Sequence, residues 1–93
     1  MLDIEVRGEE IVLRGRLDAA EAGKADRAFG AIAGSATVDA AGLEYVSSAG
    51  LSVFVKTQLR LKADGHTLRI VNAVPRVRAV FHYANLASIL TME

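Results

Sequence analysis

Cysteine and long apolar runs are both missing from this sequence of 93 residues. Without cysteine, the chain can form no disulfide, offers no thiolate nucleophile and cannot build a cysteine-ligated zinc site. No apolar run approaches the ~18 residues of a membrane-spanning helix. The first ten residues, MLDIEVRGEE, are acidic and alternating, unlike a signal peptide. We therefore expect a cytoplasmic protein that does not insert into a membrane.

A net charge is also missing, because 11 basic side chains balance 11 acidic ones. Domains that bind nucleic acid usually present a net basic face, so we expect no nucleic-acid partner. The two halves of the chain nevertheless differ. Residues 1–47 carry nine acidic and five basic side chains, whereas residues 48–93 carry two acidic and six basic ones. A fold that interleaves the two halves would cancel most of this asymmetry.

Catalytic sequence motifs are the third absence. The chain contains no G-x-S-x-G elbow, no P-loop and no G-x-G-x-x-G fingerprint. His66 and His82 have no carboxylate cluster near them in sequence, and nothing pairs either histidine with Ser48. They are therefore poor candidates for a general base or a metal ligand. We expect a protein that is not an enzyme and that needs neither a metal nor a cofactor.

Apolar side chains recur with clear periods, and these periods predict the secondary structure. Residues 2–6 and 11–17 alternate between apolar and polar and are joined by a short link, which predicts an antiparallel hairpin. Asp18-Ala19-Ala20-Glu21 has the spacing of a capping box, and Pro75 suits the first turn of a helix. Further strands are predicted over 36–40 and over 67–72, and residues 41–46 are predicted to be a connection, with an extended conformation as an alternative. Helices are predicted from 18 to about 33, from 48 to about 63, after Pro75 and as a short turn over 86–90.

This order of elements predicts an α/β fold. Strand-helix-strand passages use right-handed crossovers and place parallel strands side by side. The 52% hydrophobic content is enough for one core. We therefore expect a single domain over residues 1–93, in which helices pack on a small mixed β-sheet of about four to five strands, with the hairpin first and parallel strands after it.

Two loops at the carboxyl ends of predicted strands form the candidate functional site, as is usual in open α/β sheets. One loop contains Asp18, and the other contains Ser47 and Ser48 and leads into a predicted helix. The free N–H groups and the dipole at a helix N-terminus favour negative charge, so Ser48 is either a helix cap or the place of a phosphate. Tyr45 and Phe54, which bracket the two serines, are interpreted as core residues.

Three segments of the chain together resemble the STAS domain, the fold of bacterial anti-sigma factor antagonists. They are IVLRGRLDAAEA, VDAAGLEYVSSAGLSVFV and GHTLRIVNAVPRVRAVFHYANLASIL. The most specific part is a strand, a short link that ends in Asp-Ser-Ser-Gly-Leu in the family, and a helix. The family's G-x-L-D before the first helix is present as Gly15-Arg16-Leu17-Asp18. The resemblance implies the STAS fold over nearly the whole chain.

The resemblance further implies a partner-switching regulatory protein. In antagonists of this family, the serine before the glycine is phosphorylated by a serine kinase that is itself the anti-sigma factor. The unmodified domain binds that kinase, and the phosphorylated domain releases it. In this chain the motif's acid falls on Ser47, its first serine on Ser48, the phosphoacceptor on Ala49 and the glycine on Gly50. Ala49 has no hydroxyl, so Ser48 or Ser47 would have to accept a phosphate.

The implied binding surface is the loop between the third strand and the second helix, together with the acidic residue of the neighbouring loop. The residues that the resemblance assigns to partner binding are Asp18, Ser47, Ser48, Ala49, Gly50, Leu51 and Ser52. The partner that the resemblance implies is an anti-sigma factor that acts as a serine kinase. The front hairpin leaves a strand edge open, so we expect a monomer or a weak dimer.

A different class of STAS protein is an alternative. Small STAS subunits of lipid-transporting ABC complexes resemble this chain in having alanine before the glycine, and they act by packing on the ATPase subunit. Alanine at position 49 is therefore consistent with the alternative that the partner is the ATPase subunit of an ABC transporter. A sensor or scaffold that binds a nucleotide or a lipid at the end of the sheet is a third possibility.

Overall fold

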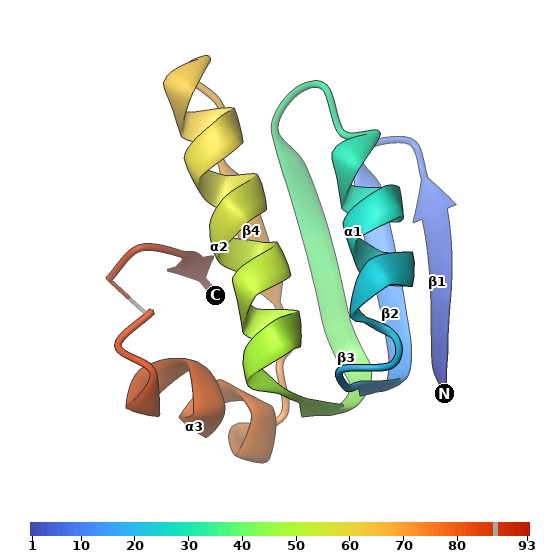
Figure 1. Cartoon of the computed structure of the whole chain (residues 1–93). Helices are drawn as coiled ribbons and strands as arrows, with labels where there is room; N and C mark the ends of the chain where they lie inside the picture. The colour runs from blue at the N-terminus through green and yellow to red at the C-terminus, as the bar shows by residue number, and fades with distance from the viewer. Residues whose placement is uncertain (87) are drawn as a thin grey trace.

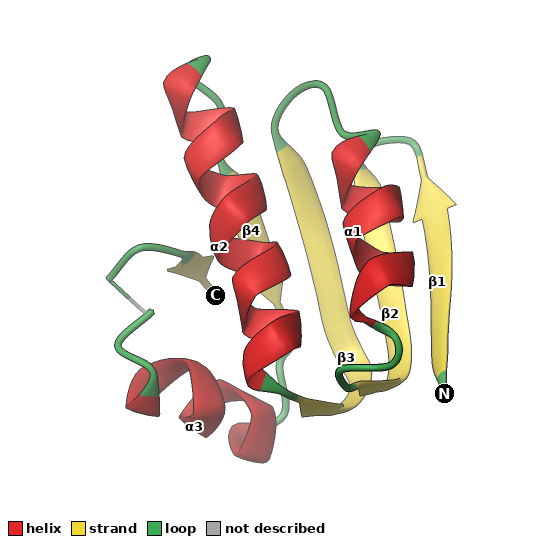
Figure 2. Cartoon of the chain, in the orientation of Figure 1, coloured by secondary structure: helices red, strands yellow, loops and turns green. Residues whose placement is uncertain are grey.

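The computed structural model describes residues 1–86 and 88–93 of the chain. Strands and helices alternate after an initial hairpin (Figures 1 and 2). In chain order the elements are β1 (Leu2–Arg7), β2 (Glu10–Leu17), α1 (Ala22–Gly30), β3 (Ala36–Val46), α2 (Ser48–Ala63), β4 (Leu68–Val71), α3 (Pro75–Tyr83) and β5 (Thr91–Met92).

The five strands form one sheet in the order β1-β2-β3-β4-β5. β1 and β2 are antiparallel, and the pairs β2–β3, β3–β4 and β4–β5 are parallel. In Figure 1, α1 and α2 lie in front of the sheet, and α3 lies beside the lower end of α2. This architecture confirms the predicted α/β fold, with a hairpin first and parallel strands after it.

The core lies between the sheet and the helices. Strand residues that face the helices are buried, for example Leu13, Val38 and Ile70, none of which exposes any surface. Phe54 of α2 stacks edge-to-face on two other rings, Phe29 of α1 and Phe81 of α3, with centroids 5.3 Å apart in both pairs. Edge-to-face aromatic pairs add to the stabilisation from burial alone. The three helices are thus joined through one aromatic side chain.

The sheet residues that point away from this core carry charge. Arg14 of β2 is paired across the hairpin with Asp3 and Glu5 of β1, each at 3.1 Å. Hydrogen bonds from Arg7 and Arg14 hold the pKa of the Glu5 carboxyl below its usual value. The hairpin itself depends on Gly15, whose φ of +98° favours glycine and whose Cβ position would fall 2.3 Å from the Met1 carbonyl oxygen.

Helix α1 is shorter at both ends than the sequence predicted. The chain turns over residues 19–21 before α1 begins at Ala22, and α1 ends at Gly30. At its carboxyl end, the guanidinium of Arg60 in α2 donates hydrogen bonds of 2.8 Å to the carbonyls of Phe29 and Ile32. A cation on the last carbonyls satisfies acceptors that the helix leaves free. This contact from a distant helix stabilises the end of α1.

The second half of the chain differs from prediction in two places. Residues 41–46, predicted to be a connection with an extended conformation as an alternative, are extended and continue β3, which runs from Ala36 to Val46 with two register shifts against β2. The predicted helical turn over 86–90 includes residue 87 and so lies outside the described residues. After it, Thr91 and Met92 pair with β4 as the short strand β5.

Candidate functional site at the start of α2

The candidate site lies where β2 and β3 end side by side, at the lower end of the sheet in Figure 1. Leu17 and Val46 are paired, and the N–H of Ser47 then donates a hydrogen bond of 2.9 Å to the Leu17 carbonyl. Asp18 and Ser47 therefore leave the sheet from adjacent positions. The structure brings the two predicted loops together, as expected for parallel strands. We call residues Ser47–Gly50 the serine turn.

Ser47, rather than Ser48, is the residue that caps α2. Its backbone is extended (φ −89°, ψ 173°), and its hydroxyl oxygen accepts a hydrogen bond of 3.2 Å from the Gly50 N–H. Its carbonyl accepts the first helical bond, of 2.8 Å, from Leu51. This is the geometry of an N-cap residue. The prediction that Ser48 could be the cap is wrong by one residue, and the Ser47 hydroxyl is already engaged.

Gly50 brings the first turn of α2 into direct contact with the strand ends. A Cβ at this position would lie 2.7 Å from Leu17 Cγ and 3.0 Å from both the Leu17 carbonyl oxygen and Val46 Cγ2. These distances leave no room for a side chain. The glycine is buried. Close packing against Leu17 and Val46 therefore favours glycine at this position, where the STAS motif also has a glycine.

The other residues of the predicted site differ in their exposure. Ser48 and Ser52 are exposed, Ala49 is half-buried and Leu51 is buried. The Ser52 hydroxyl donates a hydrogen bond of 3.1 Å to the Ser48 carbonyl one turn earlier. The Ser48 hydroxyl thus faces solvent at the amino end of a 16-residue helix, where the dipole favours negative charge.

Asp18 holds the neighbouring turn instead of capping α1. Its Oδ1 and its carbonyl oxygen both accept from the N–H of Glu21, at 3.2 and 3.1 Å. α1 begins only after this turn, with Glu21 at its N-cap and no side-chain bond there. The Asp18–Glu21 bond of the predicted capping box is therefore present, but it closes a turn that precedes α1 and does not cap the helix itself. The carboxylate stays half-buried beside the serine turn.

Tyr45 is a residue of this region that the sequence analysis placed wrongly. Its side chain is 39% exposed, and the Arg16 guanidinium lies 4.4 Å from the ring centroid. Arg16 and Tyr45 are paired across β2 and β3, each directly before an inward-facing residue, Leu17 or Val46. Alternation along a strand that extended to Val46 would have placed Tyr45 outside the core. Phe54, by contrast, is fully buried, as predicted.

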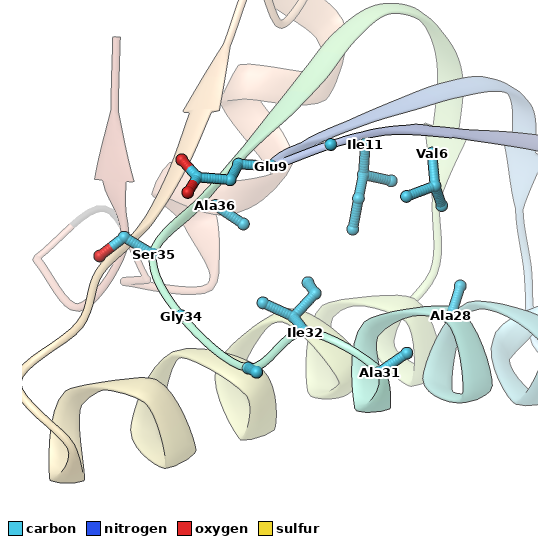
Figure 3. Close-up of a pocket in the computed structure, with 11 residues that line it drawn as sticks. Val6, Glu9, Ile11, Ala28, Ala31, Ile32, Gly34, Ser35 and Ala36 are labelled. Atoms are coloured by element: carbon cyan, nitrogen blue, oxygen red, sulfur yellow. The ribbon is translucent and has the colours of Figure 1, made fainter.

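A hollow of about 180 Å³ lies at the opposite end of the sheet. Figure 3 shows Val6 and Ile11 of the hairpin pointing into it from one side, and Ile32 and Ala28 from the other. We call it the hairpin hollow. None of the predicted site residues lines it. The predicted site and this hollow are therefore separate features at the two ends of β2 and β3.

The described residues, 1–86 and 88–93, lack two further features. No helix in these ranges has both the length and the apolar content needed to cross a membrane. No group of three or more histidine, aspartate or glutamate side chains is placed there as metal ligands would be.

Comparisons with known proteins agree on the fold. The model of the family described as "Mlab, STAS domain" matches residues 1–91. An anti-sigma factor antagonist from Mycobacterium paratuberculosis has a similar structure, with a TM-score of 0.79, 20% identity and coverage of 99% of this chain and 83% of that one. Comparison with curated proteins found no match in sequence.

The anti-sigma factor antagonist SpoIIAA is also similar in structure. Its unphosphorylated form gives a TM-score of 0.70 at 20% identity, with 100% of this chain and 87% of that chain covered. Its phosphorylated form from Bacillus gives 0.62 at 22% identity, with 100% and 91% covered. At these identities the likeness supports the fold alone. The family model, which spans almost the whole sequence, decides the family: this chain belongs to the STAS domain family.

Proposed function

We propose that this protein is a partner-switching regulator that resembles an anti-sigma factor antagonist. It binds an anti-sigma factor, which is a serine kinase, through the serine turn and the adjoining Asp18. The proposal rests on one observation: the two predicted loops leave the sheet from paired residues, Leu17 and Val46, and put an exposed Ser48 at the start of α2. A partner can contact both loops at once.

Phosphate control of this surface is restricted by the residues present. Ala49 occupies the position of the family's phosphoacceptor and has no hydroxyl, and the Ser47 hydroxyl caps the helix. Ser48 is exposed and is the remaining acceptor in the serine turn. A phosphate there would add about −1.5 to −2 charges to the binding surface. Without such a phosphate, the protein binds its partner constitutively.

A second candidate partner is the ATPase subunit of a lipid-transporting ABC complex. Ala49 favours it, because binding to such a subunit requires no phosphoacceptor in the serine turn. The binding surface is the same in both proposals. The identity of the partner is what separates them.

Capture of the partner from native lysate, with mass spectrometry, tests both the surface and the partner. Ala49→Glu places a negative charge in the serine turn, where the helix dipole tolerates it. Ala63→Glu makes the same change at the exposed far end of α2 and is the matched control. We expect the wild type and Ala63→Glu to capture a serine-kinase anti-sigma factor, and Ala49→Glu to lose it. Capture of an ABC ATPase subunit would favour the second candidate, and equal capture by all three would refute the surface.

The kinase reaction is tested separately on purified protein. If the captured partner is a kinase, we expect it to phosphorylate the wild type at Ser48, and Ser48→Ala to abolish the signal. Ser47→Ala serves as the comparison, because its hydroxyl is engaged in the cap. Absence of phosphate on the wild type would eliminate the switch and leave constitutive binding.

A further inference from the structure

β1 is an edge strand whose outer side has no neighbouring element among the described residues. The strand order places β1 outside β2, and in Figure 1 no helix lies beyond it. Its six residues, Leu2–Arg7, form a longer edge than the two residues of β5 at the opposite side of the sheet. Edge strands can pair with another strand through their free main-chain groups, and very short edges resist such pairing. β1 is therefore the edge that a further strand can join.

The hairpin pairing shows which main-chain groups of β1 are free. Arg7 and Glu10 are paired across a two-residue turn. At the other end of the hairpin, the Arg16 N–H donates a hydrogen bond of 2.8 Å to the Met1 carbonyl. In an antiparallel pair, residues that bond the neighbouring strand alternate with residues that do not. The odd-numbered residues of β1 therefore bond β2, and the even-numbered ones direct their N–H and C=O groups outward.

One of the outward groups is already engaged. The ammonium of Lys24 in α1 donates a hydrogen bond to the Leu2 carbonyl, which agrees with this alternation. Ile4 and Val6 present two N–H and two C=O groups, and none of the four has a hydrogen-bond partner within residues 1–86 and 88–93. The Val6 side chain is also 61% exposed. The free part of the edge is thus the stretch from Ile4 to Val6.

Two copies of β1 are complementary to each other in an antiparallel register centred on Glu5. In this register, Ile4 of one copy lies opposite Val6 of the other, and the two symmetric pairs give four main-chain hydrogen bonds. Asp3 then lies opposite Arg7 of the other copy, again twice. Opposite charges that face each other across strands are stabilising. Both copies use the same surface, as a two-fold axis requires.

The neighbouring registers are less favourable. A shift of two residues in one direction places Asp3 opposite Glu5 in both halves of the contact, so that like charges face each other. The opposite shift places Ile4 opposite Gly8, which belongs to the turn after β1 and has a φ of +60°. A parallel arrangement would set identical charges beside one another. The pattern of charges along β1 therefore favours the register centred on Glu5.

The side chains that this register pairs are exposed and keep free polar atoms. The Asp3 carboxylate, 68% exposed, bonds Arg14 through one oxygen. The Arg7 guanidinium, 59% exposed, bonds Glu5 through Nε. In the described part of the chain, the second oxygen of Asp3 and the two terminal nitrogens of Arg7 have no partner. Glu5 faces its own copy across the axis, but Arg7 and Arg14 of the same chain balance its charge.

We propose that two copies of this chain associate through β1, in the antiparallel register centred on Glu5. The two five-stranded sheets then join into one continuous sheet, and the exposed Val6 packs beside Ile4 of the other copy. The contact involves one short strand from each copy, so the dimer is weak. The proposal does not depend on the proposed function, because the serine turn follows β3 and contributes nothing to this edge.

Sedimentation equilibrium of the whole chain, from about 1 μM to about 1 mM, measures the association. We expect a monomer–dimer equilibrium within this range. Hydrogen exchange at the two ends of the range locates the contact, and the amides of Ile4 and Val6 should gain protection as the concentration rises. A chain that stays monomeric throughout, or a dimer in which only other amides gain protection, would overturn the proposal.

Exchange of charges tests the register. Asp3→Arg and Arg7→Asp each place like charges opposite each other and should weaken the dimer by about three- to tenfold. The variant with both changes restores opposite charges in reversed order and should dimerise nearly as well as the wild type. Asp64→Arg makes the same change of net charge at the exposed end of α2 and should have no effect. Single variants that dimerise like the wild type, or a double variant as weak as the single ones, would refute the register.

Val6→Pro tests the main-chain pairing, because it removes an outward N–H that β2 does not use. We expect this variant to keep the circular dichroism of the wild type and to lose the dimer. Val6→Ala retains the N–H and should still dimerise. A folded Val6→Pro variant that dimerises like the wild type would refute pairing through this edge. The charge variants keep every main-chain group, so they decide the question if Val6→Pro does not fold.

Discussion

The two ends of the β2–β3 pair use small residues in opposite ways. At the carboxyl end, Gly50 lets α2 approach so closely that a Cβ would fall 2.7 Å from the nearest side-chain atom. At the amino end, small residues such as Ala28 and Ala36 leave the hairpin hollow of about 180 Å³ between the hairpin and the end of α1. Small side chains therefore do not indicate loose packing by themselves. Their effect depends on whether a neighbouring element closes the space.

This contrast explains why we place function at the carboxyl end. There the packing holds the serine turn in one conformation, with Ser47 engaged in the cap and Ser48 facing solvent. A preorganised surface loses little conformational entropy when a partner binds. At the amino end, the hollow is lined mainly by apolar side chains and backbone, and it presents no comparable set of exposed hydroxyls.

The largest expected effect comes from adding a side chain at Gly50, at the carboxyl end of the β2–β3 pair. Gly50→Ala should lower the free energy of unfolding by about 1–3 kcal/mol, because the added methyl must displace Leu17 or Val46. The measurement is urea denaturation followed by circular dichroism. Gly30→Ala is the control, since its Cβ position has no neighbouring atom within 4 Å. It should stabilise the protein by about 0.5–1 kcal/mol. If the two variants behaved alike, the close contact at Gly50 would have no energetic consequence.

A smaller effect distinguishes the two serines of the turn. Ser47→Ala removes the hydroxyl that accepts from the Gly50 N–H and should cost about 1 kcal/mol of unfolding free energy. Ser48→Ala changes an exposed side chain and should stay within about 0.5 kcal/mol of the wild type. Thermal denaturation of both variants measures the difference. A larger loss for Ser48→Ala would mean that Ser48 caps the helix instead.

The smallest expected effect comes from filling the hairpin hollow, at the amino end of the β2–β3 pair. Ala28→Leu adds apolar atoms to the hairpin hollow and should raise the unfolding free energy by about 0.5–1 kcal/mol. Partner capture should not change, because the hollow and the serine turn lie at opposite ends of the sheet. A destabilised variant would show that the hollow cannot accept the larger side chain, and the contrast between the two ends would then disappear.

The predicted elements fall into two groups according to what specifies them. The bounds of α2 were predicted as 48–63 and confirmed, because its start and its apolar periodicity are local signals. α1 was predicted to begin at Asp18, but the side chain of Asp18 bonds a preceding turn. Carbonyls at its end accept hydrogen bonds from Arg60, which is remote in sequence. β5 has two residues and no pattern of its own, so pairing with β4 alone defines it.

The candidate site divides in the same way. That Asp18 and the serines would meet at one edge of the sheet followed from strand order, since parallel strands end together. Which serine caps α2, and that Tyr45 lies outside the core against Arg16, did not follow. Both depend on where β3 ends, because a strand that continues to Val46 places Tyr45 on the outer face and puts Ser47 directly before the helix.

The sequence by itself determined the order of the elements from β1 to α3, the family and the absence of a hydroxyl at position 49, because periodicity, motif spacing and residue identity are properties of the chain. Only the tertiary structure decided that Gly50 sits against Leu17 and Val46, and that Ser47 caps α2 and leaves the Ser48 hydroxyl exposed. These features require segments far apart in the chain to meet, and the free energy of their packing sets the final positions of the residues.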